Sequence, residues 1–83
     1  MKYRKKPIEV EAVQFIIEFP QLDKLREFAG DNIDYQWIHE GEISVKTLEG
    51  NMRAYEEDYI IKGIKGEFYP CNKDIFELTY EKI

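Results

Sequence analysis

The stretch DYIIKGIKGEFYPC, Asp58–Cys71, places short apolar runs on both sides of two Lys-Gly steps. Each apolar run has the length of a β-strand, and glycine supplies the positive φ that tight hairpin turns require. The stretch therefore predicts two antiparallel strands joined by a turn. We expect Ile60, Ile61 and Phe68 to point into the core and Pro70 to end the second strand.

The turn itself is a candidate phosphate site. Backbone N–H groups near Gly63 and Gly66, together with Lys62 and Lys65, form a pattern that can hold an anion. A Walker-type loop has a longer glycine spacing, a Ser or Thr after its lysine and a following helix, and this stretch has none of these. A hairpin whose glycines set the turn is the better interpretation.

The only cysteine, Cys71, is the second candidate for chemistry. A nucleophilic thiol needs a nearby base, and nothing in the sequence brings the only histidine, His39, next to it. Unreactive cysteine is commonly buried, so a structural role is expected. One Cys and one His without short ligand spacing predict no metal site, and no cofactor motif is present. We therefore expect no catalysis.

Farther toward the N-terminus, strand-like segments continue. YQWIHE and ISVKTL flank a turn at Gly41, and a second turn falls at Glu49–Asn51. The acidic run at 56–58 then separates this pair of strands from the hairpin. Together with the hairpin, these segments predict a meander of four or five short strands.

The segment PQLDKLREFAG, residues 20–30, predicts the one clear helix, over about residues 20–29. Proline suits the first turn of a helix and glycine its C-terminal cap. The apolar residues recur at helical spacing and form one stripe: Leu22, Leu25, Phe28 and Ala29. The helix is therefore amphipathic and is expected to pack on a sheet.

The two ends of the chain are expected to complete the sheet. A strand opened by Pro7 is predicted from the alternation of Ile8, Val10 and Ala12 with glutamates, with a bulge near Ala12 or burial of both faces beyond it. In the tail, Asp74 and Glu77 favour helix, whereas apolar alternation favours strand. We expect one helical turn after Cys71 and then a strand that pairs with the N-terminal one.

These elements predict a single domain, residues 1–83, of the α+β class. Its expected form is a small curved or barrel-like antiparallel β-sheet with one amphipathic helix (about 20–29) packed on it and a short C-terminal helical turn.

The charge is unevenly placed. The net charge is −5, yet the opening MKYRKK carries four positive and no negative side chains, so the rest holds 8 of the 12 basic residues against all 17 acidic ones. An acidic body makes nucleic acid an unlikely partner. No apolar run has the length of a membrane span or a signal peptide, and one cysteine suits a reducing compartment. We therefore expect a cytoplasmic protein without membrane contact.

The two ends of the chain resemble a family of small, uncharacterised proteins encoded by bacteriophages and prophages. The start, MKYRKKPIEVEAVQF, has the basic opening and the Lys-Pro that precede a first strand reading Glu-Ala-x-Gln-Phe. From Asp58 to Glu81 the chain follows the pattern Asp-Tyr-Ile-Ile-x-Gly-x-x-Gly-Glu-Phe-Tyr-Pro-Cys-x-x-Asp-x-Phe-x-x-Thr-Tyr-Glu. Members often have Pro-Gly before this Asp (a Pro-Gly-Asp-Tyr-Gly-like pattern), where this chain has Glu56-Glu57. The resemblance implies a phage origin and the cytoplasm of an infected or lysogenic bacterium, but no activity.

Binding is the expected function. The first hypothesis is an accessory protein of host-takeover or anti-defence type that binds a host or phage protein. An alternative is a nucleotide-like small ligand held by Trp37, Lys62, Lys65 and Tyr69, on the 62–71 hairpin and nearby aromatics. A second alternative is acidic mimicry of nucleic acid, which requires acidic side chains in rows on one face. Free strand edges also offer a route to a homodimer.

Overall fold

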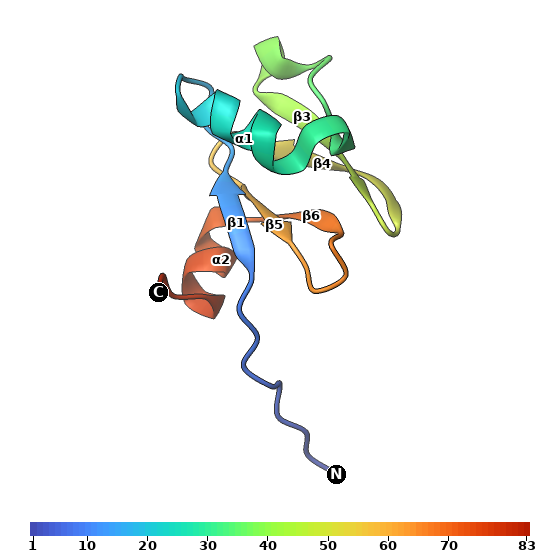
Figure 1. Cartoon of the computed structure of the whole chain (residues 1–83), viewed down its shortest axis with the longest axis vertical. Helices are drawn as coiled ribbons and strands as arrows, with labels where there is room; N and C mark the ends of the chain where they lie inside the picture. The colour runs from blue at the N-terminus through green and yellow to red at the C-terminus, as the bar shows by residue number, and fades with distance from the viewer.

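Two small antiparallel sheets and two α-helices make up the fold in the computed structural model, which describes all residues from 1 to 83 (Figure 1). One sheet has the strand order β1-β5-β6 and the other β2-β3-β4. Their strands are β1 (Glu11–Gln14), β5 (Tyr59–Lys62), β6 (Phe68–Cys71), β2 (Ile33–Asp34), β3 (Glu42–Thr47) and β4 (Gly50–Tyr55). The helices are α1 (Gln21–Ala29) and α2 (Lys73–Thr79), with 3₁₀ turns η1 (Gly30–Asn32) and η2 (Ile38–Glu40). The α+β class is confirmed.

The expected barrel-like closure is wrong. Each sheet has two free edges, because no strand of one sheet is hydrogen-bonded to a strand of the other. The segment that was needed for closure, after Cys71, forms α2 and leaves β1 without a second neighbour. Asn72 caps the start of α2: its Oδ1 accepts hydrogen bonds from the backbone N–H groups of Asp74 (2.9 Å) and Ile75 (3.3 Å). This cap favours a helix here, although the apolar alternation of the segment suits a strand.

The hairpin Tyr59–Cys71 forms as the sequence predicts, except that β6 does not end at Pro70 but continues to Cys71. Strands β5 and β6 pair antiparallel, from Tyr59 opposite Cys71 to Lys62 opposite Phe68. In the turn, the N–H of Gly66 donates to the carbonyl of Gly63 at 3.0 Å, and Gly66 has φ 79°. A side chain at that φ is strained, which explains the glycine.

The N-terminal strand is shorter than expected, beginning at Glu11 rather than near Pro7. Its only neighbour, β5, ends at Lys62 opposite Glu11, and the chain then turns away at Gly63. Residues before Glu11 therefore have no strand to pair with, although they keep the alternating pattern of one. We call residues 1–10 the arm; it projects from the body as an extended segment (Figure 1).

The segment YQWIHE is not a strand. Strand β2 ends at Asp34, whose Oδ1 accepts a hydrogen bond from the N–H of Gln36 at 2.9 Å. Such a side-chain turn competes with a ladder, and the chain continues as a turn and η2. The helix prediction, by contrast, is confirmed within one residue: α1 starts directly after Pro20 and Gly30 follows it.

The core lies between α1 and both sheets. Its members are buried and apolar: Phe15, Leu22, Leu25, Ala29, Ile33, Ile43, Val45, Ala54, Ile60 and Phe68. The ring of Phe28 in α1 meets that of Phe68 edge-on, with centroids 5.4 Å apart. Ile61 is also buried, so both faces of β5 are covered. Its neighbours across the sheet are Ala12 and Tyr69, which define a second packed face beneath α2.

Tyr35 carries a buried polar atom without a partner. It packs against the core, with the Arg26 guanidinium 5.3 Å from its ring centre as its charged neighbour, but its hydroxyl makes no hydrogen bond of normal length. An unsatisfied buried hydroxyl is destabilising, so Tyr35→Phe is expected to raise the free energy of unfolding by about 1 kcal/mol. Urea unfolding of the two proteins checks this, and a clear loss of stability in the variant would show that the hydroxyl is bonded after all.

Neither helix is long and apolar enough to cross a lipid bilayer.

Candidate functional site

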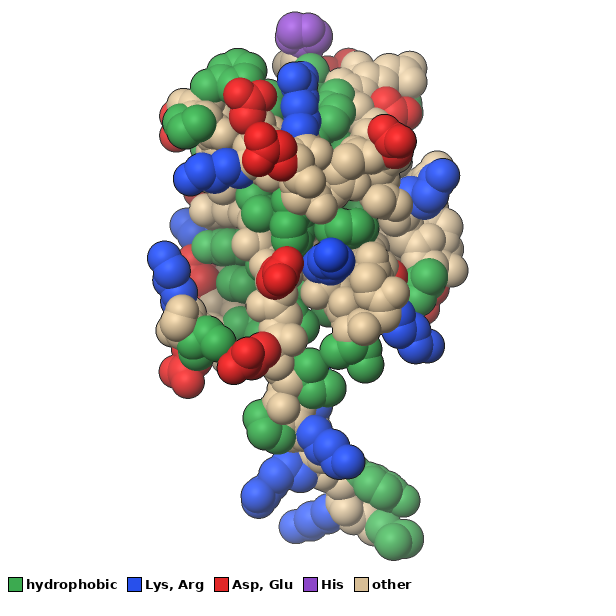
Figure 2. All heavy atoms as spheres, viewed as in Figure 1, with side chains coloured by type: hydrophobic (Ala, Val, Ile, Leu, Met, Phe, Trp, Pro, Cys, Tyr) green, Lys and Arg blue, Asp and Glu red, His purple; other side chains and the backbone are tan.

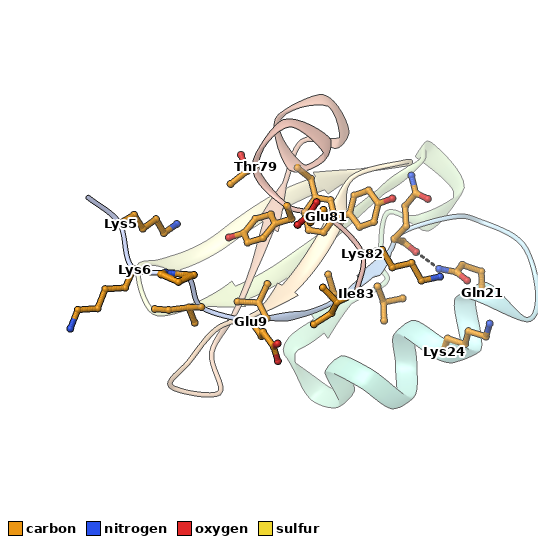
Figure 3. Close-up of a pocket in the computed structure, with 18 residues that line it drawn as sticks. Lys5, Lys6, Glu9, Gln21, Lys24, Thr79, Glu81, Lys82 and Ile83 are labelled. Atoms are coloured by element: carbon orange, nitrogen blue, oxygen red, sulfur yellow. Dashed lines mark hydrogen bonds between the residues drawn. The ribbon is translucent and has the colours of Figure 1, made fainter. Parts of the chain in front are cut away.

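A groove of about 910 Å³ lies where the two ends of the chain meet β1 (Figure 3). One wall is the arm from Lys5 to Val10, and the opposite wall is the end of α2 with residues 80–83. Strand β1 and Tyr59 form the floor, and Gln21 and Lys24 of α1 close one end. We call this the terminal groove. It brings together parts of the chain that are remote in sequence.

Aromatic packing positions the α2 wall. The ring of Phe76 stacks on that of Tyr59 with centroids 3.9 Å apart and nearly parallel planes, and Tyr80 lies 4.9 Å from Phe76. Helical spacing puts residues 76 and 80 on one face of α2, so both rings reach the sheet. The helix is therefore docked by rings that also line the groove.

Lysines dominate the rim of the groove. Its lining includes four lysines (Lys5, Lys6, Lys24 and Lys82) against two glutamates (Glu9 and Glu81). Figure 3 shows Lys24 and Lys82 at the α1 end and Lys5 and Lys6 at the arm end. This surplus is notable in a chain of net charge −5. The groove is the place on this acidic protein where an acidic partner meets a favourable field.

The floor adds apolar surface to this charge. Ile8, Val10, Val13 and Ile83 all line the groove. Ile8 and Ile83 remain 46% and 88% exposed, so water covers them in the free protein. An apolar floor with a charged rim is the usual composition of a surface that binds a partner.

The hairpin turn already contains an anion of its own. The carboxylate Oε1 of Glu67 accepts a hydrogen bond from the N–H of Lys65 at 2.9 Å. A Cβ at Gly63 would fall 2.6 Å from both carboxylate oxygens, so glycine there leaves room for the Glu67 side chain. The turn thus has the geometry of an anion site, and Glu67 occupies the place where a phosphate would lie.

The four residues proposed for ligand binding do not meet. Trp37 lies next to η2, and the Arg53 guanidinium stacks over its ring at 4.4 Å. Lys62 and Lys65 are exposed in the β5–β6 hairpin. Tyr69 lines a smaller groove of about 340 Å³ between that hairpin and the β3–β4 turn. Neither groove is lined by Trp37, Lys62 or Lys65, so their binding role stays a prediction.

Tyr69 has an altered acidity. Burial, followed by a hydrogen bond with Tyr80 and by the negative charges of Tyr80, Glu67 and Cys71, raises the pKa of Tyr69 to about 12. The folded state thus favours the neutral phenol, whereas the unfolded chain ionises it near pH 10.

This raised pKa predicts a specific loss of stability in alkali. The stabilisation linked to the neutral phenol is complete below about pH 10 and declines as the pH rises toward 12. Urea unfolding between pH 9 and pH 12 should therefore show a steeper decline for the natural protein than for Tyr69→Phe. Parallel declines would mean that Tyr69 ionises equally in both states.

Cys71 lacks the setting of a nucleophile. Burial and the negative charge of Asp58 raise the pKa of its thiol, and its Sγ lies 3.6 Å from the Asn72 carbonyl, to which it donates. His39 is exposed at the end of the molecule opposite the arm, whereas Cys71 directly precedes α2 (Figures 1 and 2). No group of three or more His, Cys, Asp or Glu side chains is placed to hold a metal ion.

Several acidic side chains near the turn after β4 make local contacts. Glu42 pairs with Arg53 at 3.1 Å, and Glu57 lies 3.6 Å from Lys73. The carboxylate of Asp58 accepts from the N–H of Tyr55 at 2.9 Å. These three acids have partners within the chain, and mimicry of nucleic acid stays a prediction.

Comparison with family models, curated proteins and solved structures finds no match for this chain.

Sequence reasoning did not find the terminal groove. It depends on α2 folding back over β1, which the mixed pattern of residues 73–83 left open between helix and strand. One signal was present: Phe76 and Tyr80 stand at helical spacing.

Proposed function

We propose that this chain is a small phage-encoded accessory protein that acts in the bacterial cytoplasm by binding a host or phage protein. The terminal groove carries the proposal, because it combines an open apolar floor with an excess of lysine at the rim. The phage origin rests on the resemblance at the two ends of the chain. The raised pKa of the Cys71 thiol disfavours a cysteine nucleophile, which supports binding as the function.

The chemistry of the groove defines the partner. Its floor requires apolar side chains, and its four lysines require nearby carboxylates or other negative groups. The fitting partner is therefore an acidic protein segment that carries apolar residues. Attraction to the lysines speeds association and weakens as the salt concentration rises, whereas apolar contacts with the floor slow dissociation.

Charge reversal at the rim tests this function. The tagged protein is expressed in bacteria, and the proteins it retains are identified by mass spectrometry. The double variant Lys24→Glu/Lys82→Glu reverses two rim lysines that Figure 3 places close together. We expect it to lose a partner that the natural protein retains, with the partner's binding weakened at least ~10-fold.

The matched control is Lys62→Glu/Lys65→Glu, which makes the same change on the hairpin, outside the groove. We expect this control to retain the partner. Loss of the partner in the hairpin variant but not in the rim variant would place binding on the hairpin. Equal retention by both variants would overturn the proposed role of the lysines.

A small anionic ligand is the second candidate. The Nζ of Lys5 lies 6.0 Å from the ring centre of Tyr80, so an aromatic face and cations meet in the same groove. This arrangement suits a nucleotide better than the separated set of Trp37, Lys62, Lys65 and Tyr69. Thermal unfolding with and without ATP, GTP and their monophosphates tests it. A bound nucleotide raises the melting temperature with concentration, and no rise at millimolar levels excludes this candidate.

A further inference from the structure

The arm has the sequence of a strand but lacks a neighbour. Ile8 and Val10 alternate with Glu9 and Glu11, as in a half-buried strand. In the structure, pairing starts only at Glu11 and every residue from 1 to 9 is exposed. Such a segment exposes unpaired backbone N–H and carbonyl groups, which is the usual template for strand addition.

The direction of the free edge follows from the hydrogen bonds of Phe15. Its N–H donates to the carbonyl of Asp58 at 2.8 Å and its carbonyl accepts from Glu57 at 2.7 Å, so its backbone groups face the β5 side. Backbone groups alternate along a strand, so those of Gln14 and Ala12 face away from β5. The Gln14 carbonyl indeed accepts from the Gln21 side chain at 2.9 Å, outside the sheet (Figure 3).

Continuing this alternation into the arm keeps its outer edge intact. The backbone groups of Ile8 and Val10 fall on the outer edge, together with those of Ala12. Pro7, which has no N–H, falls on the inner side, where no strand pairs. The proline therefore does not interrupt the outer edge, which can form a continuous ladder.

The charges of this segment are self-complementary. Four basic residues precede Pro7 and two glutamates follow Ile8: Lys2, Arg4, Lys5, Lys6, Glu9 and Glu11. In antiparallel pairing of two copies about a two-fold axis near Pro7 and Ile8, the basic half of each arm lies opposite the acidic half of the other. Opposite charges across strands stabilise such pairing, and the two copies of Ile8 meet near the axis.

The other sheet edges are less suited to this pairing. Strand β6 contains Pro70, which removes a donor, and β2 has only two residues. Strand β4 is the one other long edge, with six residues. It lacks the division into a basic and an acidic half.

We propose that two copies of this chain associate through their arms, which pair antiparallel along the outer edge of residues 4–12 and join the two β1-β5-β6 sheets into one six-stranded sheet. Ile8, Val10 and Ala12 of both copies lie on one face of this sheet. This is the face toward α2, because Ala12 lies opposite Ile61 and Tyr69. The pairing uses the arm, which is also one wall of the terminal groove, so Lys5 cannot serve a partner and a second copy at once, whereas Lys24 and Lys82 lie outside the arm.

The contact of Lys5 with Tyr80 does not oppose this pairing. At 6.0 Å it is near the outer limit of a cation–π contact, and both side chains are accessible to water. Such contacts are weak at exposed sites, so Lys5 exchanges Tyr80 for a glutamate of the other copy. One pair of strands makes a small interface, so we expect a dissociation constant in the micromolar range.

Charge-reversed arms provide the test, with sedimentation velocity at ~1–500 µM as the measurement. The natural protein should pass from monomer to dimer in this range. Lys5→Glu and Glu9→Lys/Glu11→Lys should each weaken dimerisation at least ~10-fold, because Lys5 of one copy lies beside the glutamates of the other and like charges then face one another. An equal mixture of the two variants should dimerise again as a mixed pair.

A proline pair tests the edge itself. Ile8→Pro removes an N–H on the outer edge and is expected to abolish the dimer. Glu9→Pro removes an N–H on the inner side. After allowance for the lost charge, it should leave the dissociation constant of the dimer within ~3-fold of the natural protein's value. Both positions are exposed, and unchanged far-ultraviolet circular dichroism confirms that the variants fold.

Three outcomes would overturn the arm pairing: a monomer throughout the concentration range, no heterodimer from the mixed charge variants, or equal effects of the two prolines. A dimer that forms instead through β4 would be abolished by Asn51→Pro and unaffected by Ile8→Pro. Partner capture through Lys24 and Lys82 is measured separately, so failure of the dimer leaves the proposed function standing.

Discussion

Phe15→Ala is expected to destabilise the protein by about 3–5 kcal/mol, a large part of the total stability of a domain of this size. The Phe15 side chain is fully buried in the core between α1 and the two sheets. Its removal leaves a cavity that the surrounding residues cannot fill without moving α1. Urea unfolding followed by circular dichroism measures the change.

Phe19→Ala is the matched control, because that ring is 67% exposed and lies just before α1. We expect a change within about 0.5 kcal/mol. Similar losses in the two variants would contradict the position of the core.

Phe76→Ala is expected to detach α2 and to disrupt the terminal groove. The ring is stacked between Tyr59 and Tyr80, and α2 has only seven residues, too few to be stable alone. We expect a loss of about 2 kcal/mol, since the ring is half-buried, together with loss of helical signal. Partner binding through the groove should decrease in parallel, because one wall is lost.

Leu78→Ala provides the control within the same helix. The Leu78 side chain is 89% exposed, so its removal costs little packing. Alanine favours a helix at least as much as leucine does. It should retain both α2 and partner binding. A stable Phe76→Ala protein with intact helical signal would show that aromatic stacking does not hold α2.

The elements specified by local sequence were predictable. Turn glycines and apolar runs located the hairpin, and α1 followed from its apolar stripe between Pro20 and Gly30. The buried positions of Ile60, Ile61 and Phe68 were also correct. Ile60 and Ile61 lie in the central strand β5, which is covered on both faces, and Phe68 of β6 packs into the core below α1.

The parts that depend on long-range pairing were not predictable. Residues 7–10 have a strand pattern, but the length of β1 is set by where β5 ends, at Lys62. In the tail, one hydrogen-bonded cap at Asn72 decides between helix and strand. The terminal groove depends on both outcomes, so the sequence did not bring its lysines together as a site. The predicted binding set was chosen by residue type and is not assembled in one groove: Trp37, Lys62, Lys65 and Tyr69.

Site-specific photocrosslinking is the sharpest measurement of where this protein binds. A photoreactive phenylalanine analogue is placed at Ile83, an apolar and exposed position in the terminal groove, and in a second protein at Lys46, exposed on β3 outside it. Irradiation in bacterial cells should crosslink position 83 to a partner protein and leave position 46 uncrosslinked. A product of twice the chain's own mass reports self-association and is counted apart. Crosslinking of the same partner from position 46 but not from position 83 would contradict the groove as the binding surface.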